Sequence, residues 1–77
     1  RINGVCPNEV NTPMLRSGFA ARGINPDTAV AELGASVPLG RIAEPEDIAD
    51  VVVFLASDKA RYICGELIEV SGAKAVS

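Results

Sequence analysis

The feature that most constrains the fold of this 77-residue chain is a pair of short strand-like segments near its two ends. Residues 1–6 and 66–70 are rich in the aliphatic side chains that strands favour. The long stretch between them carries helical patterns instead. A strand, a crossover containing helices and a second strand form one βαβ unit, with parallel strands and a right-handed crossover. The sequence therefore predicts an α/β fold built on one parallel strand pair.

Proline next to a capping side chain marks the start of each helix expected in the crossover. The cap at 11–13 precedes a short helix over residues 14–22, and the cap at 25–27 precedes a second helix that Gly34 ends. The longest helix covers residues 45–57. The crossover is therefore expected to contain two short helices and one long helix.

The longest helix carries more apolar surface than one sheet contact requires. Its main stripe, which can cover a sheet, contains Ile48, Val51, Val52 and Leu55. Phe54 projects away from this stripe beside Val53, toward the side that holds Asp47. A phenyl group on a polar face, close to an expected edge strand, suggests a covered surface. We predict that Phe54 lies in a contact between copies of the protein, and packing against the Tyr62 loop is the alternative.

The charge and composition argue against several kinds of partner. The chain has 7 basic and 10 acidic residues, a net charge of −3, and no basic cluster, which disfavours nucleic acid and anionic membranes. Its longest apolar run, residues 51–56, is too short to span a bilayer, and no signal-peptide pattern opens it. We expect a cytoplasmic protein whose Cys6 and Cys64 are free thiols at opposite ends of the sheet. Because the chain begins at Arg1, we also expect a fragment.

The residue types that the sequence lacks limit its chemistry. Without histidine the chain holds no Ser-His-Asp triad, no HExxH metal site and no histidine general base. None of the seven glycines forms a G-x-G pair, so the dinucleotide-binding fingerprint is absent. The acidic residues between positions 44 and 50 fit helix capping and a solvated surface better than a metal site. We therefore expect neither catalytic residues nor a metal in this chain.

Three segments together resemble the C-terminal part of a short-chain dehydrogenase/reductase. Residues 1–14 resemble the family's segment after its sixth strand, where Asn-x-x-x-Pro-Gly is followed by an apolar residue and threonine. Residues 38–58, with Pro-Leu-Gly-Arg and Glu-Pro-Glu-Asp, are similar to its last helix, and residues 62–70 to its closing strand. The sequence departs from the family at Asn8, where glycine is usual, and at residues 71–73, where Ser-Gly-Ala replaces Asp-Gly-Gly.

The resemblance implies a fold and a ligand. The fold is the C-terminal βαβ part of a Rossmann-like doubly wound parallel sheet, incomplete on its own, with residues 1–77 ending a single NAD(P)-binding domain. In such folds ligands lie beyond the carboxyl ends of the strands. The family's contacts with the nicotinamide carboxamide of NAD or NADP map onto the loop that holds Pro7, Asn8, Val10 and Thr12. A plain strand exit with a helix cap at Thr12 is the alternative.

The resemblance also assigns residues 14–37 to a substrate lid. Met14, Leu15 and Phe19 would then line an apolar wall facing an alcohol or ketone, although such spacing also fits simple packing. Family oligomers commonly pair the last helix and strand across a two-fold axis, which implies a homodimer or homotetramer.

The family's Ser-Tyr-Lys catalytic set is missing from this chain. Tyr62, which we expect to be a packing residue, has Glu66 rather than lysine four positions later. We therefore expect the parent protein to be an NAD(P)-dependent dehydrogenase and the 77-residue piece alone to be inactive and poorly folded. A noncatalytic βαβ interaction or oligomerisation module is the main alternative. A hydrolase or transferase is disfavoured, since no nucleophile and base pair is present.

Overall fold

The computed structural model describes residues 1–74 and contains two strands and three α-helices in the expected order. The elements are β1 (Gly4–Pro7), α1 (Pro13–Ala21), α2 (Pro26–Ala35), α3 (Pro45–Ala56), the 3₁₀ turn η1 (Asp58–Ala60) and β2 (Leu67–Val70). The two strands pair in parallel, from Gly4 opposite Leu67 to Pro7 opposite Val70. The predicted α/β fold with one parallel strand pair is therefore confirmed.

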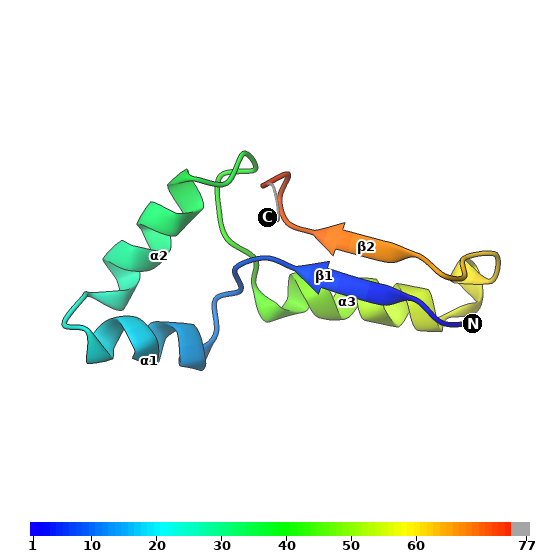
Figure 1. The fold of residues 1–77 in the computed structure, drawn as a ribbon, viewed down its shortest axis with the longest axis horizontal. Helices are drawn as coiled ribbons and strands as arrows, with labels where there is room; N and C mark the ends of the chain where they lie inside the picture. The colour runs from blue at the N-terminus through cyan, green and yellow to red at the C-terminus, as the bar shows by residue number, and fades with distance from the viewer. Residues whose placement is uncertain (75–77) are drawn as a thin grey trace.

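The chain forms an elongated body with a helical hairpin at one end. Helix α3 runs along one face of the β1–β2 pair, whereas α1 and α2 project beyond the carboxyl ends of the strands (Figure 1). The radius of gyration is 14.6 Å, while a compact domain of this length would have about 11 to 12 Å. Within residues 1–74 the buried apolar side chains are few, namely Ala29, Val37, Ile42, Leu55 and Ala60. Together these features describe an incomplete α/β domain.

Side chains reinforce the backbone pairing at the start of β1, where the Gly65 N–H donates to the Ile2 carbonyl at 2.7 Å and the Gly4 N–H donates to the Glu66 carbonyl at 2.8 Å. The Arg1 guanidinium donates hydrogen bonds to the carbonyls of Leu55 (2.9 Å) and Ser57 (3.1 Å), at the C-terminal end of α3. The Asn3 amide donates to the Ile63 carbonyl, and its oxygen accepts from the Glu66 N–H at 3.0 Å. The strand begins at Gly4, so the prediction of a strand over residues 1–6 was wrong at its start; Arg1 binds the end of α3, and Asn3 binds the segment that precedes β2.

Two predicted boundaries shift at residues that usually interrupt structure. Pro7 is the last residue of β1 rather than the residue beyond it, which is tolerated because the ladder stops there. Helix α2 continues through Gly34 to Ala35. A Cβ at Gly34 would lie 3.2 Å from the Arg41 Cα, so this glycine lets the returning chain pack closely against α2. Its role is close packing, and the prediction that it ends the helix was wrong.

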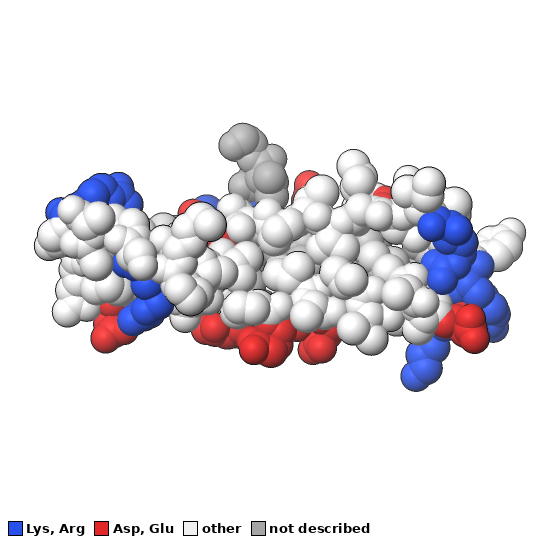
Figure 2. Space-filling model, turned by 90° about the horizontal axis from the view of Figure 1, so that it is seen from below, with Lys and Arg blue, Asp and Glu red and all other residues white. Residues whose placement is uncertain are grey.

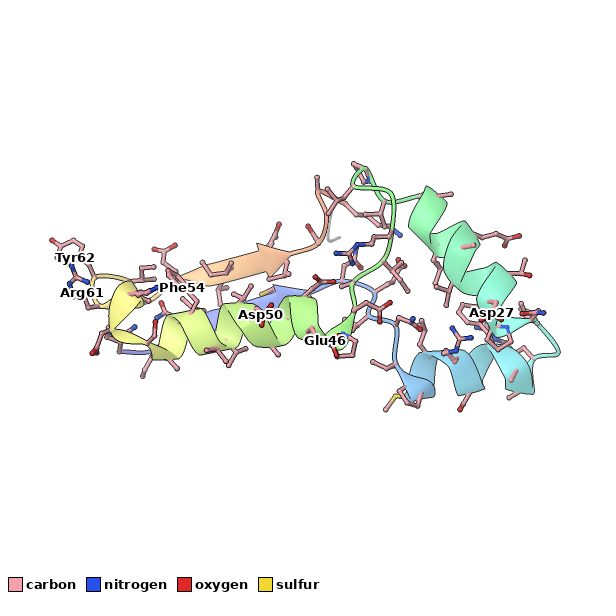
Figure 3. All side chains as sticks on the ribbon, turned by 180° about the vertical axis from the view of Figure 1, so that it is seen from behind. Asp27, Glu46, Asp50, Phe54, Arg61 and Tyr62 are labelled. Carbon is pink, nitrogen blue, oxygen red and sulfur yellow. The ribbon has the colours of Figure 1, made fainter. Side chains whose placement is uncertain are left out.

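The apolar residues of α3 divide unequally between sheet and surface. Leu55 is buried and Val51 half-buried, but Val52 is 49% exposed, so the prediction that it covers the sheet was wrong within this chain. Val52 borders a hollow together with Val5 of β1, and no residue of β2 lines this hollow. Tyr62 is fully exposed and packs against nothing in residues 1–74, which contradicts its predicted packing role. It therefore does not cover Phe54 (Figure 3).

The cysteines match the prediction. Cys6 is a half-buried free thiol in β1, and Cys64 is an exposed free thiol that precedes β2. Because Cys6 lies opposite Glu69 near the carboxyl ends, the two thiols sit at opposite ends of the strand pair. Among residues 1–74, no helix is long and apolar enough to cross a membrane. Nor does that part of the chain gather three or more His, Cys, Asp or Glu side chains in a position to hold a metal ion.

Candidate functional site

The predicted cofactor-binding residues lie at and just beyond the carboxyl ends of the two parallel strands. The loop of residues 8–12 leaves β1 at this edge and leads directly into α1 (Figure 1). Pro7 is exposed, while Asn8, Val10 and Thr12 are half-buried. In doubly wound folds this edge is where ligands bind. The structure thus brings the four predicted residues together at a position that suits a ligand.

Val10 has the clearest binding geometry in the loop. It forms a parallel bridge with Ala43, in which the Ala43 N–H donates to the Glu9 carbonyl (3.1 Å) and the Ala43 carbonyl accepts from the Asn11 N–H (2.8 Å). In this parallel pattern the N–H and C=O of Val10 itself point away from Ala43. Neither group is hydrogen-bonded to any residue in the described range 1–74. One donor and one acceptor are therefore presented side by side.

Thr12 has the structural role that was the alternative to its predicted cofactor contact. Its hydroxyl oxygen accepts a hydrogen bond from the Leu15 N–H at 3.2 Å and caps α1. A hydroxyl that accepts one bond still has its own hydrogen to donate. The cap is thus established, and the hydroxyl hydrogen remains available to a ligand next to Val10.

The replacement of glycine by Asn8 costs the backbone little. Ala73 is the sole residue other than glycine with a positive φ within residues 1–74, so Asn8 has an ordinary backbone conformation. The second departure from the family pattern is different, because Ala73 has a φ of 72° and occupies the left-handed region. The family's glycine preference therefore has a conformational reason at residue 73.

The three predicted lid residues lie on α1 with different exposures. Met14 is 84% exposed, whereas Leu15 and Phe19 are half-buried. Arg16 in α1 forms an ion pair with Asp27 in α2, which closes the hairpin. The hairpin presents apolar side chains beyond the strand ends, and their contact with a substrate remains a prediction.

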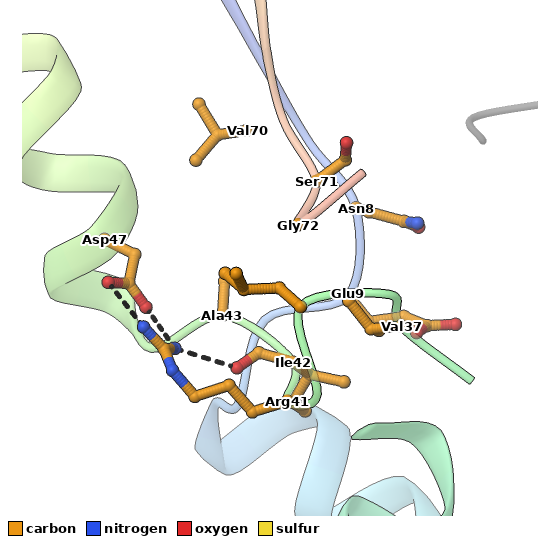
Figure 4. Close-up of a pocket in the computed structure, with 11 residues that line it drawn as sticks. Asn8, Glu9, Val37, Arg41, Ile42, Ala43, Asp47, Val70, Ser71 and Gly72 are labelled. Atoms are coloured by element: carbon orange, nitrogen blue, oxygen red, sulfur yellow. Dashed lines mark hydrogen bonds and ion pairs between the residues drawn. The ribbon is translucent and has the colours of Figure 1, made fainter. Parts of the chain in front are cut away.

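A cavity of about 190 Å³ lies between the strand ends and the chain that returns from the hairpin (Figure 4). Its lining comprises Asn8, Glu9, Val37, Leu39, Arg41, Ile42, Ala43, Asp47, Val70, Ser71 and Gly72. Arg41 forms two hydrogen bonds with the Asp47 carboxylate, at 2.7 and 3.2 Å. Asp47 also accepts the Glu44 N–H at 2.8 Å, and this cap was foreseen from the acidic helix start.

The Arg41–Asp47 pair supports the site electrostatically and mechanically. The Arg41 guanidinium, together with the Glu44 N–H, lowers the pKa of Asp47 from 3.8 to about 2. Hydrogen bonding to Asp47 raises the pKa of Arg41. Both groups are therefore charged near neutral pH, and neither suits proton transfer. The pair anchors residues 41–44 to the start of α3 and so holds Ala43 in register with Val10.

Comparison with known proteins shows the family. A family model described as enoyl-(acyl carrier protein) reductase matches residues 1–72. The chain belongs to the short-chain dehydrogenase/reductase family. The chain is 42% identical over 73 residues to a 3alpha-hydroxysteroid dehydrogenase of Mediterraneibacter gnavus, covering 95% of this chain and 26% of that protein. A glucose and ribitol dehydrogenase homolog of Oryza sativa is 39% identical over 72 residues, covering 94% and 22%.

Solved structures of short-chain dehydrogenases have the same arrangement of strands and helices. A C-terminal deletion mutant of Thermoplasma acidophilum aldohexose dehydrogenase superposes with a TM-score of 0.87 at 33% identity, over 94% of this chain and 33% of that one. A glucose/ribitol dehydrogenase from Brucella melitensis gives 0.78 at 34% identity, covering 100% and 29%. The chain spans about a quarter of the length of the curated relatives it matches. The predicted Rossmann-like part is thereby confirmed.

Proposed function

We propose that the chain is the C-terminal part of an NAD(P)-dependent oxidoreductase that transfers hydride between a nicotinamide and an alcohol or ketone. The observation that carries this proposal is the free donor and acceptor pair of Val10 at the carboxyl edge of the sheet. Relatives that are named dehydrogenases for hydroxysteroids and (3R)-3-hydroxyacyl-CoA support the reaction class. The proposal includes a cytoplasmic location, in keeping with two free thiols.

The residues of the loop fit a nicotinamide carboxamide. The carbonyl oxygen of a primary carboxamide has two lone pairs, which can accept from the Val10 N–H and from the Thr12 hydroxyl, while one of its N–H groups donates to the Val10 C=O. Pro7 and Asn8 set the direction in which the loop leaves β1. A bound nicotinamide supplies or accepts the hydride. The chain's own part is to bind the carboxamide, and so to choose which face of the ring meets the substrate.

The 77-residue piece is proposed to be inactive without the rest of the protein. Tyr62 lies at the amino end of β2, at the opposite edge of the sheet from the loop of residues 8–12. It is also fully exposed and has no lysine four residues later. The Ser-Tyr-Lys set is therefore proposed to lie upstream. The lid residues Met14, Leu15 and Phe19 are proposed to contact the alcohol or ketone.

Thr12 provides the test in the longer protein that carries this segment. Replacing Thr12 by Val should weaken binding of NAD or NADP by roughly threefold to tenfold, because one hydrogen bond is lost. ADP-ribose has no nicotinamide, so its affinity should not change. Thr12→Ser keeps the hydroxyl and serves as the matched control. An equal loss of affinity for the dinucleotide and for ADP-ribose would show that Thr12 is only a helix cap.

We further propose that the complete protein is a homodimer or homotetramer that pairs α3 and β2 across a two-fold axis. Phe54 is 43% exposed and borders an apolar groove with Asp50, Val51, Leu55 and Ile68. Beside this groove, β2 has β1 as its only partner within residues 1–74, so its other edge is unpaired. An apolar groove next to an open strand edge fits a second copy of the same surface.

The distribution of charge along α3 also suits an antiparallel pairing. Glu46 and Asp50 lie toward the start of α3, whereas Arg61 lies beyond its end (Figure 3). The same separation is visible on the molecular surface, with acidic side chains near the middle and basic side chains at the end that holds η1 (Figure 2). A two-fold axis between antiparallel helices brings each acidic region toward the basic region of the other copy.

Sizing of Phe54→Asp in the longer protein tests this assembly. The charge should dissociate the oligomer at low micromolar concentration, because it would be buried without a partner. Val53→Asp is the matched control, since Val53 is 67% exposed, lies on the same helix and does not border the groove. An intact oligomer with Phe54→Asp would exclude a central role for this surface.

A further inference from the structure

The segment after β2 packs closely against the chain that returns from the helical hairpin. The Leu39 N–H donates to the Gly72 carbonyl at 3.1 Å. Gly72 has a φ of 60°, and a Cβ there would lie 2.7 Å from the Val37 Cγ1. Val37 itself is buried. Residues 71–74 are thus seated against residues 37–39, at the base of the hairpin.

Lys74 joins three parts of the chain that are far apart in sequence. Its ammonium group contacts both oxygens of the Glu9 carboxylate, at 3.1 and 3.0 Å, and the Ser36 hydroxyl at 3.1 Å. Ser36 caps the C-terminal end of α2, and its hydroxyl donates to the Leu33 carbonyl at 2.7 Å, leaving its oxygen to accept from Lys74. The Lys74 and Glu9 side chains are 27% and 28% exposed. Partial burial makes this pair less screened than a surface ion pair.

Glu9 adjoins the residue that presents the free backbone pair. Its carbonyl accepts the Ala43 N–H, and the next residue is Val10. A contact that fixes Glu9 therefore restricts the orientation of the Val10 N–H and C=O. The same lysine fixes the end of α2 through Ser36. The geometry points to Lys74 as a positioning residue that couples the loop of residues 8–12 to the base of the helical hairpin.

This inference rests on the proposed function, because it has Lys74 hold the loop of residues 8–12, which would bind nicotinamide, in a fixed position relative to the substrate lid. A loop that is already held in place loses less conformational freedom when a ligand binds. Removing the Lys74 ammonium group should therefore weaken nicotinamide binding and raise the substrate KM, while kcat changes less. Lys74 acts through Glu9 and Ser36 and does not touch the cofactor.

Binding by the longer protein provides the first test. With Lys74→Met, the Kd for NAD or NADP should rise about fivefold, the effect expected of one partly buried ion pair. The Kd for ADP-ribose should stay unchanged. Glu9→Gln should weaken nicotinamide binding no more than Lys74→Met does, since it leaves the Lys74–Ser36 contact in place. The double variant should be no worse than Lys74→Met, because both substitutions remove the Glu9–Lys74 pair. The exchanged pair Glu9→Lys with Lys74→Glu should recover part of the affinity.

Lys59→Met is the matched control for a lost ammonium group. Lys59 is exposed in η1, at the other end of the sheet, and forms none of the ion pairs found among residues 1–74. It should leave both affinities unchanged. The positioning role would be overturned if the effects of the Glu9 and Lys74 substitutions on the Kd were additive. It would also be overturned if Lys74→Met weakened the binding of ADP-ribose as much as that of the dinucleotide.

Amide hydrogen exchange without ligand separates this inference from the proposed function. Lys74→Met should speed exchange in both residues 8–12 and residues 33–40, whereas Lys59→Met should change neither. Unchanged exchange in either segment would overturn the coupling, whatever the protein binds. If the wild-type protein binds NAD, NADP and ADP-ribose equally well, the proposed nicotinamide site is refuted. The coupling through Lys74 is still tested in that case, by hydrogen exchange alone.

Discussion

Two substitutions at adjacent residues should change the stability of the protein in opposite directions: Gly72→Ala should lower the free energy of unfolding, and Ala73→Gly should raise it. Both residues have a positive φ, of 60° and 72°. An L-residue in this region costs about 1 to 2 kcal/mol relative to glycine. At residue 72 the added Cβ would also lie 2.7 Å from the Val37 Cγ1 and 3.2 Å from the Leu39 Cβ. Because Val37 is a buried β-branched residue, it has little freedom to move.

The expected magnitudes follow from these contacts. Gly72→Ala adds backbone strain and overpacking, and should lower the free energy of unfolding by about 2 to 4 kcal/mol. Ala73→Gly removes the strain but increases the freedom of the unfolded chain, so a net gain of about 0.5 to 1 kcal/mol is expected. Urea unfolding of the longer protein, followed by circular dichroism, measures both. A neutral Gly72→Ala, or a destabilising Ala73→Gly, would refute the conformational reasoning.

Two further predictions concern acid stability and the folding of the isolated chain. The folded-state pKa of Asp47 is about 2, below its ordinary value of 3.8, so the ionised carboxylate stabilises the folded protein fully above about pH 4 and loses this effect as the pH falls toward 2. Asp47→Asn should therefore make stability depend less on pH in acid unfolding curves. An unchanged curve would contradict this prediction. The 77-residue chain by itself should show no cooperative thermal transition, since few of its apolar side chains are buried, and a sharp melt by circular dichroism would refute this.

Local signals were enough to predict the order of the elements. The prolines at positions 13, 26 and 45 each stand at the first turn of a helix, as the sequence indicated. The parallel pairing followed from the length and helical content of the crossover. The loop of residues 8–12 could be proposed as a site because parallel strands place their carboxyl ends at one edge. These inferences depend on residues that are close in sequence or on general topology.

The features that were missed depend on contacts between distant residues. The open backbone groups of Val10 result from its pairing with Ala43, and the Glu9–Lys74 pair joins residues at nearly opposite ends of the chain. Helical periodicity assigned Val52 to the sheet contact, but the side chain is half exposed and borders an open hollow beside β1. A periodic pattern shows which residues share a face and does not show how far the neighbouring strands reach. The acidic residues between positions 44 and 50 predicted capping at the start of α3, and the Asp47 carboxylate provides that cap.

The bridge between Val10 and Ala43 has a consequence for how sequences of this kind can diversify. Residues 11–42, which contain the helical hairpin, start and end at nearly the same point, because the Val10–Ala43 bridge holds the two ends of this segment together. A change in the length of a segment closed in this way mainly alters the entropy of closing the loop, by about 0.6 kcal/mol for each doubling of the number of residues. Insertions and deletions between α1 and α2, which leave the Ser36–Lys74 contact and the Arg41–Asp47 pair in place, should be tolerated without moving the backbone pair of Val10. Under the proposed function, changes at this far end of the hairpin can then alter substrate preference while cofactor binding is kept.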